Sequence, residues 1–266
     1  MQTKVTDKEI FDCSDNLKAV ASMLIFDLAE KATTPKDFYL RNSIAKSVSL
    51  LDSIITLYKQ GYVDNAIILY RALLDRLIHV LYIDYNDLYQ DFRFETLISN
   101  FDHVSNARSN EDFKKLLKDP LFQISKEERK QYKEYKQSSK GWIKPDPKQV
   151  LKDNELGSLY KVGYDYSSRR VHPNYFDGYQ EFHLLTGLKP NPFEKFEDEI
   201  IINNSLLISA VLINRCISHS SFKFRRVVID YINSIINFLH GGGDKNYQVH
   251  FIKISKMFKE EVDLSK

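Results

Sequence analysis

Residues that break regular secondary structure are scarce in this sequence, which has 9 glycines and 7 prolines among 266 residues. This scarcity favours long helices over a turn-rich β protein. Cysteine is almost absent, with only Cys13 and Cys216. Two cysteines exclude a disulfide framework and are typical of a protein from a reducing compartment. We therefore expect a cytoplasmic protein.

Targeting and membrane signals are also missing. Residues 1–16 contain no apolar run after a basic start, so we expect no signal peptide. No apolar run approaches about 18 residues without a charge, so we expect no membrane-spanning helix. The net charge is only +2, so the composition as a whole demands neither a nucleic-acid nor an acidic partner.

The common motifs for metals, cofactors and hydrolytic nucleophiles do not occur. The seven histidines form no HExxH motif, and the two cysteines form no CxxC motif. There is no GxSxG motif, no Walker-type loop and no dinucleotide-binding glycine loop. The sequence therefore predicts neither a metal site nor a cofactor.

Helical periodicity is abundant. Apolar residues recur with helical spacing in five long segments: 15–31, 36–59, 64–85, 193–218 and 223–239. Thr34, Pro35 and Asp37 form a helix start signal, and Gly61 is a helix stop. Asp64 is the expected cap of the 64–85 helix, which is apolar nearly all round and is expected to be central. The pattern predicts an all-α bundle of about seven to nine helices.

A charged insertion is expected within this bundle, at about 105–150, while the bundle itself spans 1–240. A helix at 86–101 precedes a polar break, a short helix is expected at 112–118, and a capping box at Ser125 opens a helix with almost no apolar face. That helix is interpreted as a solvated helix or an excursion from the body. A basic surface for RNA or DNA is the alternative, which the interleaved acidic residues weaken.

Two further segments complete the predicted organisation. Residues 176–194 are expected to be mostly irregular, because they contain several glycines and prolines. Three glycines at 241–243 indicate a flexible joint. They separate the bundle from a C-terminal segment, 241–266, with a last short helix at about 246–259.

A polar stripe is the most unusual feature of the sequence. Tyr160, Tyr164, Ser168 and His172 recur at every fourth residue, which places them on one helical face. Pro173 predicts that the helix ends at His172, because the residue before proline is disfavoured in helical geometry. His172 is a candidate general acid or base, since an imidazole titrates near neutrality. Alternatively, it bonds a carbonyl at the helix end.

Two pairs of charged residues on other helices are candidate partners for this stripe. Arg71 and Asp75 are one turn apart on the most apolar helix, where they predict an ion pair that orders the bundle. The functional alternative is that either residue faces His172 or Ser168 across the bundle. Arg215 and His219 form a second one-turn pair, which is interpreted as cations at a helix C-terminus.

The helix that carries Arg71 and the helix that carries the polar stripe together resemble a known family. The segment YRALLDRLIHVLYI and the later Tyr-rich segment ending SSRRVHPNY resemble an uncharacterised family of bacterial helical proteins. That family pairs an R-x-x-x-E/D helix with an S-x-x-x-H-P helix end, and the match covers roughly residues 40 to 220. It is similar to HEPN-like proteins, many of which are ribonucleases of toxin–antitoxin and phage-defence systems.

The resemblance implies a function for individual residues. Carried over residue by residue, it points to five positions: Arg71, Asp75, Ser168, His172 and Arg170. The first four are the expected catalytic residues. Arg170, together with Tyr160, Tyr164 and Arg169 from the polar stripe and its neighbours, is expected to bind the substrate. This chain departs from the family in having Asp75 in place of the commoner glutamate. It also lacks the arginine and histidine, separated by four to six residues, of HEPN ribonucleases.

Three hypotheses about function follow. The first is a metal-independent, dimeric enzyme that acts on RNA. The second is a non-catalytic binding or regulatory module of a defence system, in which the polar cluster is structural and a partner protein comes from the same operon. The third is a small-molecule sensor with an aromatic pocket formed by Trp142, Tyr160, Tyr164 and Tyr166.

Overall fold

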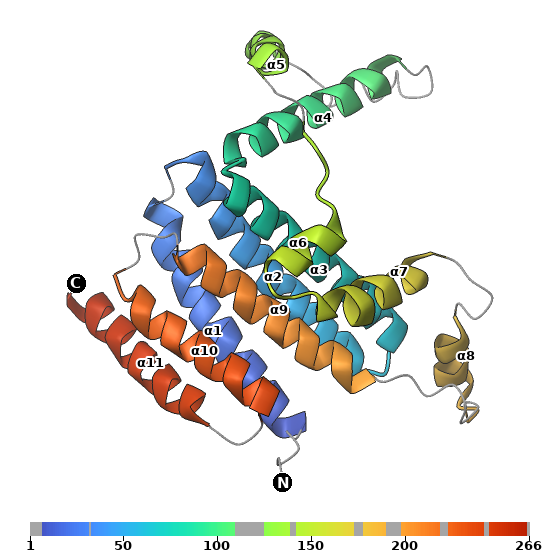
Figure 1. The fold of residues 1–266 in the computed structure, drawn as a ribbon, viewed down its shortest axis with the longest axis vertical. Helices are drawn as coiled ribbons and strands as arrows, with labels where there is room; N and C mark the ends of the chain where they lie inside the picture. Colours follow the sequence, from blue (N-terminus) through green and yellow to red (C-terminus); the bar gives the residue numbers. More distant parts are fainter. Residues whose placement is uncertain are drawn as a thin grey trace. The chain divides into compact units, whose positions relative to one another are not determined.

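The computed structural model describes eight stretches of the chain: residues 7–31, 33–109, 125–138, 142–172, 178–189, 198–218, 223–241 and 245–264. Within these stretches there are eleven α-helices, one π-helix and no strand (Figure 1). The predicted all-α fold is confirmed. The helices fall into two compact units, Met1–Tyr82 with Asp146–Lys266 and Ile83–Pro145.

The larger unit is built from long helices. Helix α9 packs against α2 and α10, α11 packs against α10, and α1 packs against α2 (Figure 1). Their buried faces consist of aliphatic side chains with a few tyrosines, whose removal from water supplies the main stabilisation. The bounds of the long helices are α1 (Asp7–Lys31), α2 (Pro35–Lys59), α3 (Val63–Asn86), α9 (Asp198–Ser218), α10 (Arg225–Gly241) and α11 (Asn246–Leu264).

The predicted start and stop signals of α2 are confirmed. The Thr34 hydroxyl accepts a hydrogen bond from the Asp37 backbone N–H at 3.2 Å, and the Asp37 carboxylate accepts one from the Thr34 N–H at 3.1 Å. Gly61 follows the helix with a φ of +84°, which glycine adopts without strain. The expected Asp64 cap of α3 is wrong. This helix begins at Val63, and Asp64 lies in its first turn.

Helix α9 contains a window, Ile201–Ser218, that is long and apolar enough to cross a membrane by length and composition alone. The window contains one charged residue, Arg215. Of its residues, 61% are buried inside the structure. Such burial is typical of a core helix.

The smaller unit begins at Ile83, before the expected position near residue 105. Its helix α4 (Tyr89–Ser109) extends into the segment that was expected to be a polar break. Helix α5 (Lys126–Ser138) packs against α4. The rings of Phe101 and Tyr132 stack with centroids 3.8 Å apart, and those of Phe94 and Tyr135 with centroids 4.5 Å apart. The helix expected at 112–118 lies outside the described residues.

Short helices bring the number of α-helices in the described residues to eleven, above the predicted seven to nine. Helix α6 (Pro147–Asp153) was not predicted, although Asp146 caps it and Pro147 occupies its first position. Helix α8 (Tyr179–Thr186) lies in a segment expected to be irregular, between two glycines with positive φ. At the C-terminus, α11 is longer than expected and packs against α10 and α1. It is therefore part of the larger unit. Residues 242–244 of the glycine joint lie outside the described residues.

Candidate functional site: an arginine-centred cluster

The predicted stripe is formed by two different helical segments. Residues Tyr160–Asp165 form a π-helix, η3, and the chain continues directly into α7 (Tyr166–Val171). Within η3 the rings of Tyr160 and Tyr164 stack with centroids 5.6 Å apart. The sequence reasoning assumed a regular α-helix and did not predict the π-helix. π-helical turns are rare and are frequent at functional sites.

Gly163 explains how η3 approaches α3 so closely. A Cβ atom at this position would overlap the hydroxyl oxygen of Tyr70 and would lie 3.1 Å from a methyl carbon of Leu74. Only glycine leaves room for the Tyr70 phenol, whose pKa is raised to about 12 by burial. The backbone of η3 therefore rests directly on α3.

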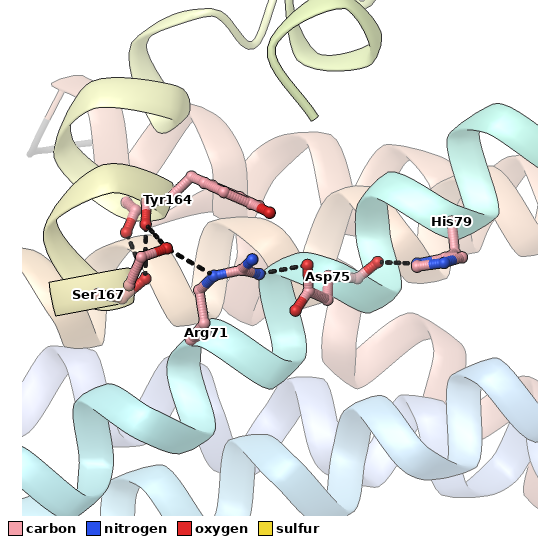
Figure 2. A network of polar contacts seen from close by, with 7 residues as sticks. Arg71, Asp75, His79, Tyr164 and Ser167 are labelled. Carbon is pink, nitrogen blue, oxygen red and sulfur yellow. Dashed lines mark hydrogen bonds and ion pairs between the residues drawn. The ribbon is translucent and has the colours of Figure 1, made fainter. Parts of the chain in front are cut away.

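Arg71 of α3 is the centre of the polar cluster. Its guanidinium carbon lies 3.5 Å from the centroid of the Tyr164 ring, and its Nε donates a hydrogen bond to the Ser168 hydroxyl at 3.2 Å. Its Nη1 forms an ion pair with Asp75 Oδ1. Figure 2 shows Tyr164 on one side of Arg71 and Asp75 on the other. One side chain thus binds a ring, a hydroxyl and a carboxylate.

The two serines of α7 hold the turn that faces Arg71. Ser168 donates its hydrogen to the Tyr164 carbonyl at 2.6 Å, so its oxygen is oriented to accept from Arg71. Ser167 is buried and donates to the Gly163 carbonyl at 2.5 Å. Ser167 was not predicted as a site residue. Its spacing of four residues from Gly163 is its only sequence signal.

His79 extends the cluster along α3. Its Nδ1 lies 2.8 Å from the backbone carbonyl oxygen of Asp75, as Figure 2 shows. A carbonyl only accepts, so Nδ1 carries the hydrogen in this contact. His79 was not among the site residues predicted from the sequence.

His172 lies at the exposed end of this arrangement. It is the C-terminal cap of α7, with extended backbone angles, and its side chain is exposed. Among the residues that the structure describes, its ring makes no hydrogen bond or ion pair with Arg71 or Asp75. In the described residues, His172 therefore does not bond the ion pair of Arg71 and Asp75. Arg71 instead meets Ser168, which the sequence analysis had named as the other partner.

The remaining predicted residues are distributed around this edge. Arg169 is exposed, and Tyr160 and Tyr164 are partly buried. The side chain of Arg170 and the whole of His219 lie outside the described residues. Arg215, the expected partner of His219, donates to the Asn154 side chain at 3.1 Å and so connects α9 to the end of α6.

The geometry assigns distinct tasks to the buried and exposed groups. The Arg71 side chain is only 13% exposed, whereas that of Asp75 is 43% exposed. The Nε and Nη1 groups of Arg71 and one face of its guanidinium are thus all engaged within the chain. The cluster therefore fixes η3 and α7 on α3. In the described residues no group of three His, Cys, Asp or Glu side chains is placed to hold a metal ion.

Comparison with known proteins identifies one family whose model matches this chain. A model described as a family of unknown function (DUF5677) matches residues 37–184. This region includes Arg71, Asp75, Ser168 and His172. No curated protein and no solved structure matches the chain.

Proposed function

This chain belongs to the DUF5677 family of unknown function, which matches more than half of its residues, and we propose that it is a metal-independent protein that acts on RNA. The proposal assigns the reaction to the exposed imidazole of His172 and the positioning of that imidazole to the arginine-centred cluster. The observation that carries it is the bond from Arg71 to Ser168, one helical turn before His172. The HEPN-like resemblance of the two helices supports the choice of RNA.

The proposed reaction needs only water and groups that this chain contains. His172 accepts the proton of a ribose 2′-hydroxyl while that oxygen attacks the adjacent phosphorus. The bond from phosphorus to the 5′-oxygen then breaks, and the 5′-oxygen takes a proton from a water molecule. The hydroxide that remains takes the proton that His172 had accepted. The products are a 2′,3′-cyclic phosphate and a 5′-hydroxyl. The exposed Arg169 beside His172 would stabilise the charge that develops on the phosphate.

Arg71, Asp75 and Ser168 are positioning residues in this proposal. Because Arg71 is largely buried and bonded within the chain, it orients α7 and does not hold the substrate. Tyr160 presents a partly exposed ring, against which an unpaired base can stack. The Tyr164 ring contacts Arg71 and stacks with Tyr160, so in this proposal it supports Tyr160.

The cellular setting is part of the same proposal. As in the HEPN-like proteins that it resembles, the chain would act in the cytoplasm, in a bacterial defence or toxin-type system. It would act as a homodimer and be controlled by a partner protein from the same operon.

The test is incubation of the purified protein with total RNA in the presence of EDTA. The wild type is expected to produce fragments with cyclic phosphate ends, and His172→Ala is expected to reduce the rate at least 100-fold. His240→Ala is the matched control, because His240 is also exposed near the end of a helix. Arg71→Lys is expected to lower kcat more than it changes KM. Intact RNA with the wild type, or equal cleavage by His172→Ala, would reject the proposal.

A second function is favoured by one observation. The bonds of Arg71 to Asp75, Ser168 and Tyr164 are all made within the chain, as in a cluster that only orders a bundle. On this alternative the protein is a non-catalytic binding or regulatory module. Full activity of His172→Ala in a biological assay, with loss of that activity in a destabilised Arg71→Leu variant, would favour it.

A further inference from the structure

Helix α5 of the smaller unit carries a one-sided positive charge. It contains five exposed cations: Lys126, Arg129, Lys130, Lys133 and Lys136. At 3.6 residues per turn, these five positions lie within an arc of about 120° around the helix axis. The three acids of the helix, Glu127, Glu128 and Glu134, lie outside that arc. The cations are therefore gathered on one side of the helix, with Glu134 next to Lys130 at its border. We call the five cations the basic stripe.

Aromatic contacts determine which way the basic stripe faces. Tyr132 and Tyr135 stack on Phe101 and Phe94 of α4, and the Tyr132 hydroxyl donates to the Asp102 side chain at 3.0 Å. The centre of the basic stripe lies about 130° around the helix from the midpoint of these two tyrosines. The basic stripe is therefore turned mostly away from α4 and toward solvent, with Lys136, which bonds the Tyr132 hydroxyl, nearest to α4.

Among the described residues of the smaller unit, little neutralises the basic stripe. Lys130 lies 3.9 Å from Glu134 in a pair whose side chains are 80% and 57% exposed, a geometry that contributes little. Lys136 donates to the Tyr132 hydroxyl at 2.9 Å. Other neighbours within the basic stripe, such as Arg129 and Lys133, are like charges one turn apart, and this arrangement opposes helix formation. A bound polyanion would relieve the repulsion.

We infer that the basic stripe binds the phosphate backbone of single-stranded RNA. The five residues extend over about 15 Å of helix, which lets them follow several successive phosphates. The basic stripe has no apolar side chain, so it lacks the anchors typical of a protein–protein hot spot. This inference rests on the proposed function for the choice of RNA. It adds the surface that holds the strand, whatever the chemistry at His172.

The experiment measures RNA binding without cleavage. A 20-nucleotide unstructured RNA is titrated with the His172→Ala protein in EDTA at several salt concentrations. A triple variant then adds Lys126→Gln, Arg129→Gln and Lys133→Gln, which remove three charges and retain good helix formers. The control carries Lys253→Gln, Lys256→Gln and Lys259→Gln, three exposed lysines of α11. The two triple variants change the net charge equally.

The expected result separates the two triple variants. The α5 variant should bind RNA at least tenfold more weakly and flatten the slope of log K against log salt by about 2, since each single-strand phosphate contact contributes about 0.7. The α11 variant should bind as its parent does. The inference is overturned if both triple variants weaken RNA binding equally, or if neither variant weakens it. Tighter binding of duplex DNA or of phosphatidylserine vesicles through the same residues would overturn the assignment to RNA.

Failure of the inference is distinguishable from failure of the proposed function. Binding through α5 with no cleavage by the wild type would support the inference and reject the ribonuclease. Cleavage with an unchanged KM in the α5 triple variant, made in the wild-type background, would reject the inference and support the ribonuclease.

Discussion

At the scale of single residues, Arg71 shows what a guanidinium can do that an ammonium cannot. Its planar face lies on the Tyr164 ring, and its edges meet Ser168 and Asp75. A lysine is a compact point charge without this face or fork. The shape of the arginine side chain therefore matters more than its positive charge at position 71. For this reason Arg71→Lys is not a conservative change.

Gly163 is the residue that permits this arrangement. Gly163→Ala is expected to lower the free energy of unfolding by about 1–3 kcal/mol, as for other overpacked sites, because the new Cβ would overlap the Tyr70 hydroxyl. In the Tyr70→Phe background the same change should cost less, since the overlapping oxygen is gone. Urea unfolding of the four proteins measures this coupling.

Gly157 offers the control for the double-mutant cycle of Gly163 and Tyr70. A Cβ at Gly157 would lie 4.0 Å from the nearest backbone atom, so Gly157→Ala should change stability by no more than about 0.5 kcal/mol. Strictly additive effects of Gly163→Ala and Tyr70→Phe would show that the close approach to Tyr70 does not determine the need for glycine.

At the scale of elements, α5 shows how a helix without buried residues keeps its place. It has 13 residues and no buried side chain, and isolated helices of this length are marginal in water. Its capping box is formed, with the Glu128 N–H donating to the Ser125 hydroxyl at 3.1 Å. The two stacked tyrosines supply the tertiary contacts.

Removal of those rings should therefore release α5. In Tyr132→Ala/Tyr135→Ala we expect the amide protons of α5 to exchange with solvent at least tenfold faster, because each aromatic pair is worth about 0.5–1.5 kcal/mol beyond its buried area. Exchange in α1 and α2 should not change. Hydrogen exchange with mass spectrometry makes the measurement. Exposed Gln131→Ala/Gln137→Ala is the control, and equal acceleration in both variants would contradict the anchoring role of the rings.

At the scale of the whole molecule, α11 closes the core of the larger unit. Tyr247 of α11 is fully buried, and its side chain lies near the thiol of Cys13 of α1. Burial raises the pKa of the Cys13 thiol to about 12. The thiolate is the reactive form of cysteine, so both its low population and its burial protect Cys13.

Cys13 should consequently report on the packing of α11. At pH 8 we expect the native protein to resist a thiol reagent at Cys13, with modification only on unfolding. Tyr247→Ala should open a cavity beside Cys13 and accelerate its modification by at least tenfold. Mass spectrometry of the labelled peptide gives the rate. Tyr85→Ala, at a side chain that is 87% exposed, is the control. Rapid labelling of native Cys13 would contradict this account.

Sequence reasoning predicted features that depend on nearby residues. The Thr34–Asp37 capping box, the end of α2 before Gly61 and the Ser125–Glu128 capping box all follow from contacts within a few positions. The start of α3 was misplaced by assigning the cap to Asp64. The short helices α6 and α8 were missed, because an element of seven or eight residues has too few apolar positions to show a period.

The polar cluster was only partly predictable. The ion pair between Arg71 and Asp75 could be inferred from its spacing along one helix. The bond between Arg71 and Ser168 joins residues 97 positions apart, and it was one of two alternatives that the pattern allowed. The π-helix could not be inferred, because it depends on how Gly163 packs against Tyr70.

By itself, the amino-acid sequence determined the helical class and the ends of α2, since apolar periodicity and capping act over one or two turns. Tertiary structure alone decided that Arg71 meets Ser168 while His172 lies exposed, and that α5 turns its cations away from α4. Both outcomes depend on which helical faces pack together. Helix packing is a property of segments distant in the sequence, and the pattern within either segment does not encode its partner.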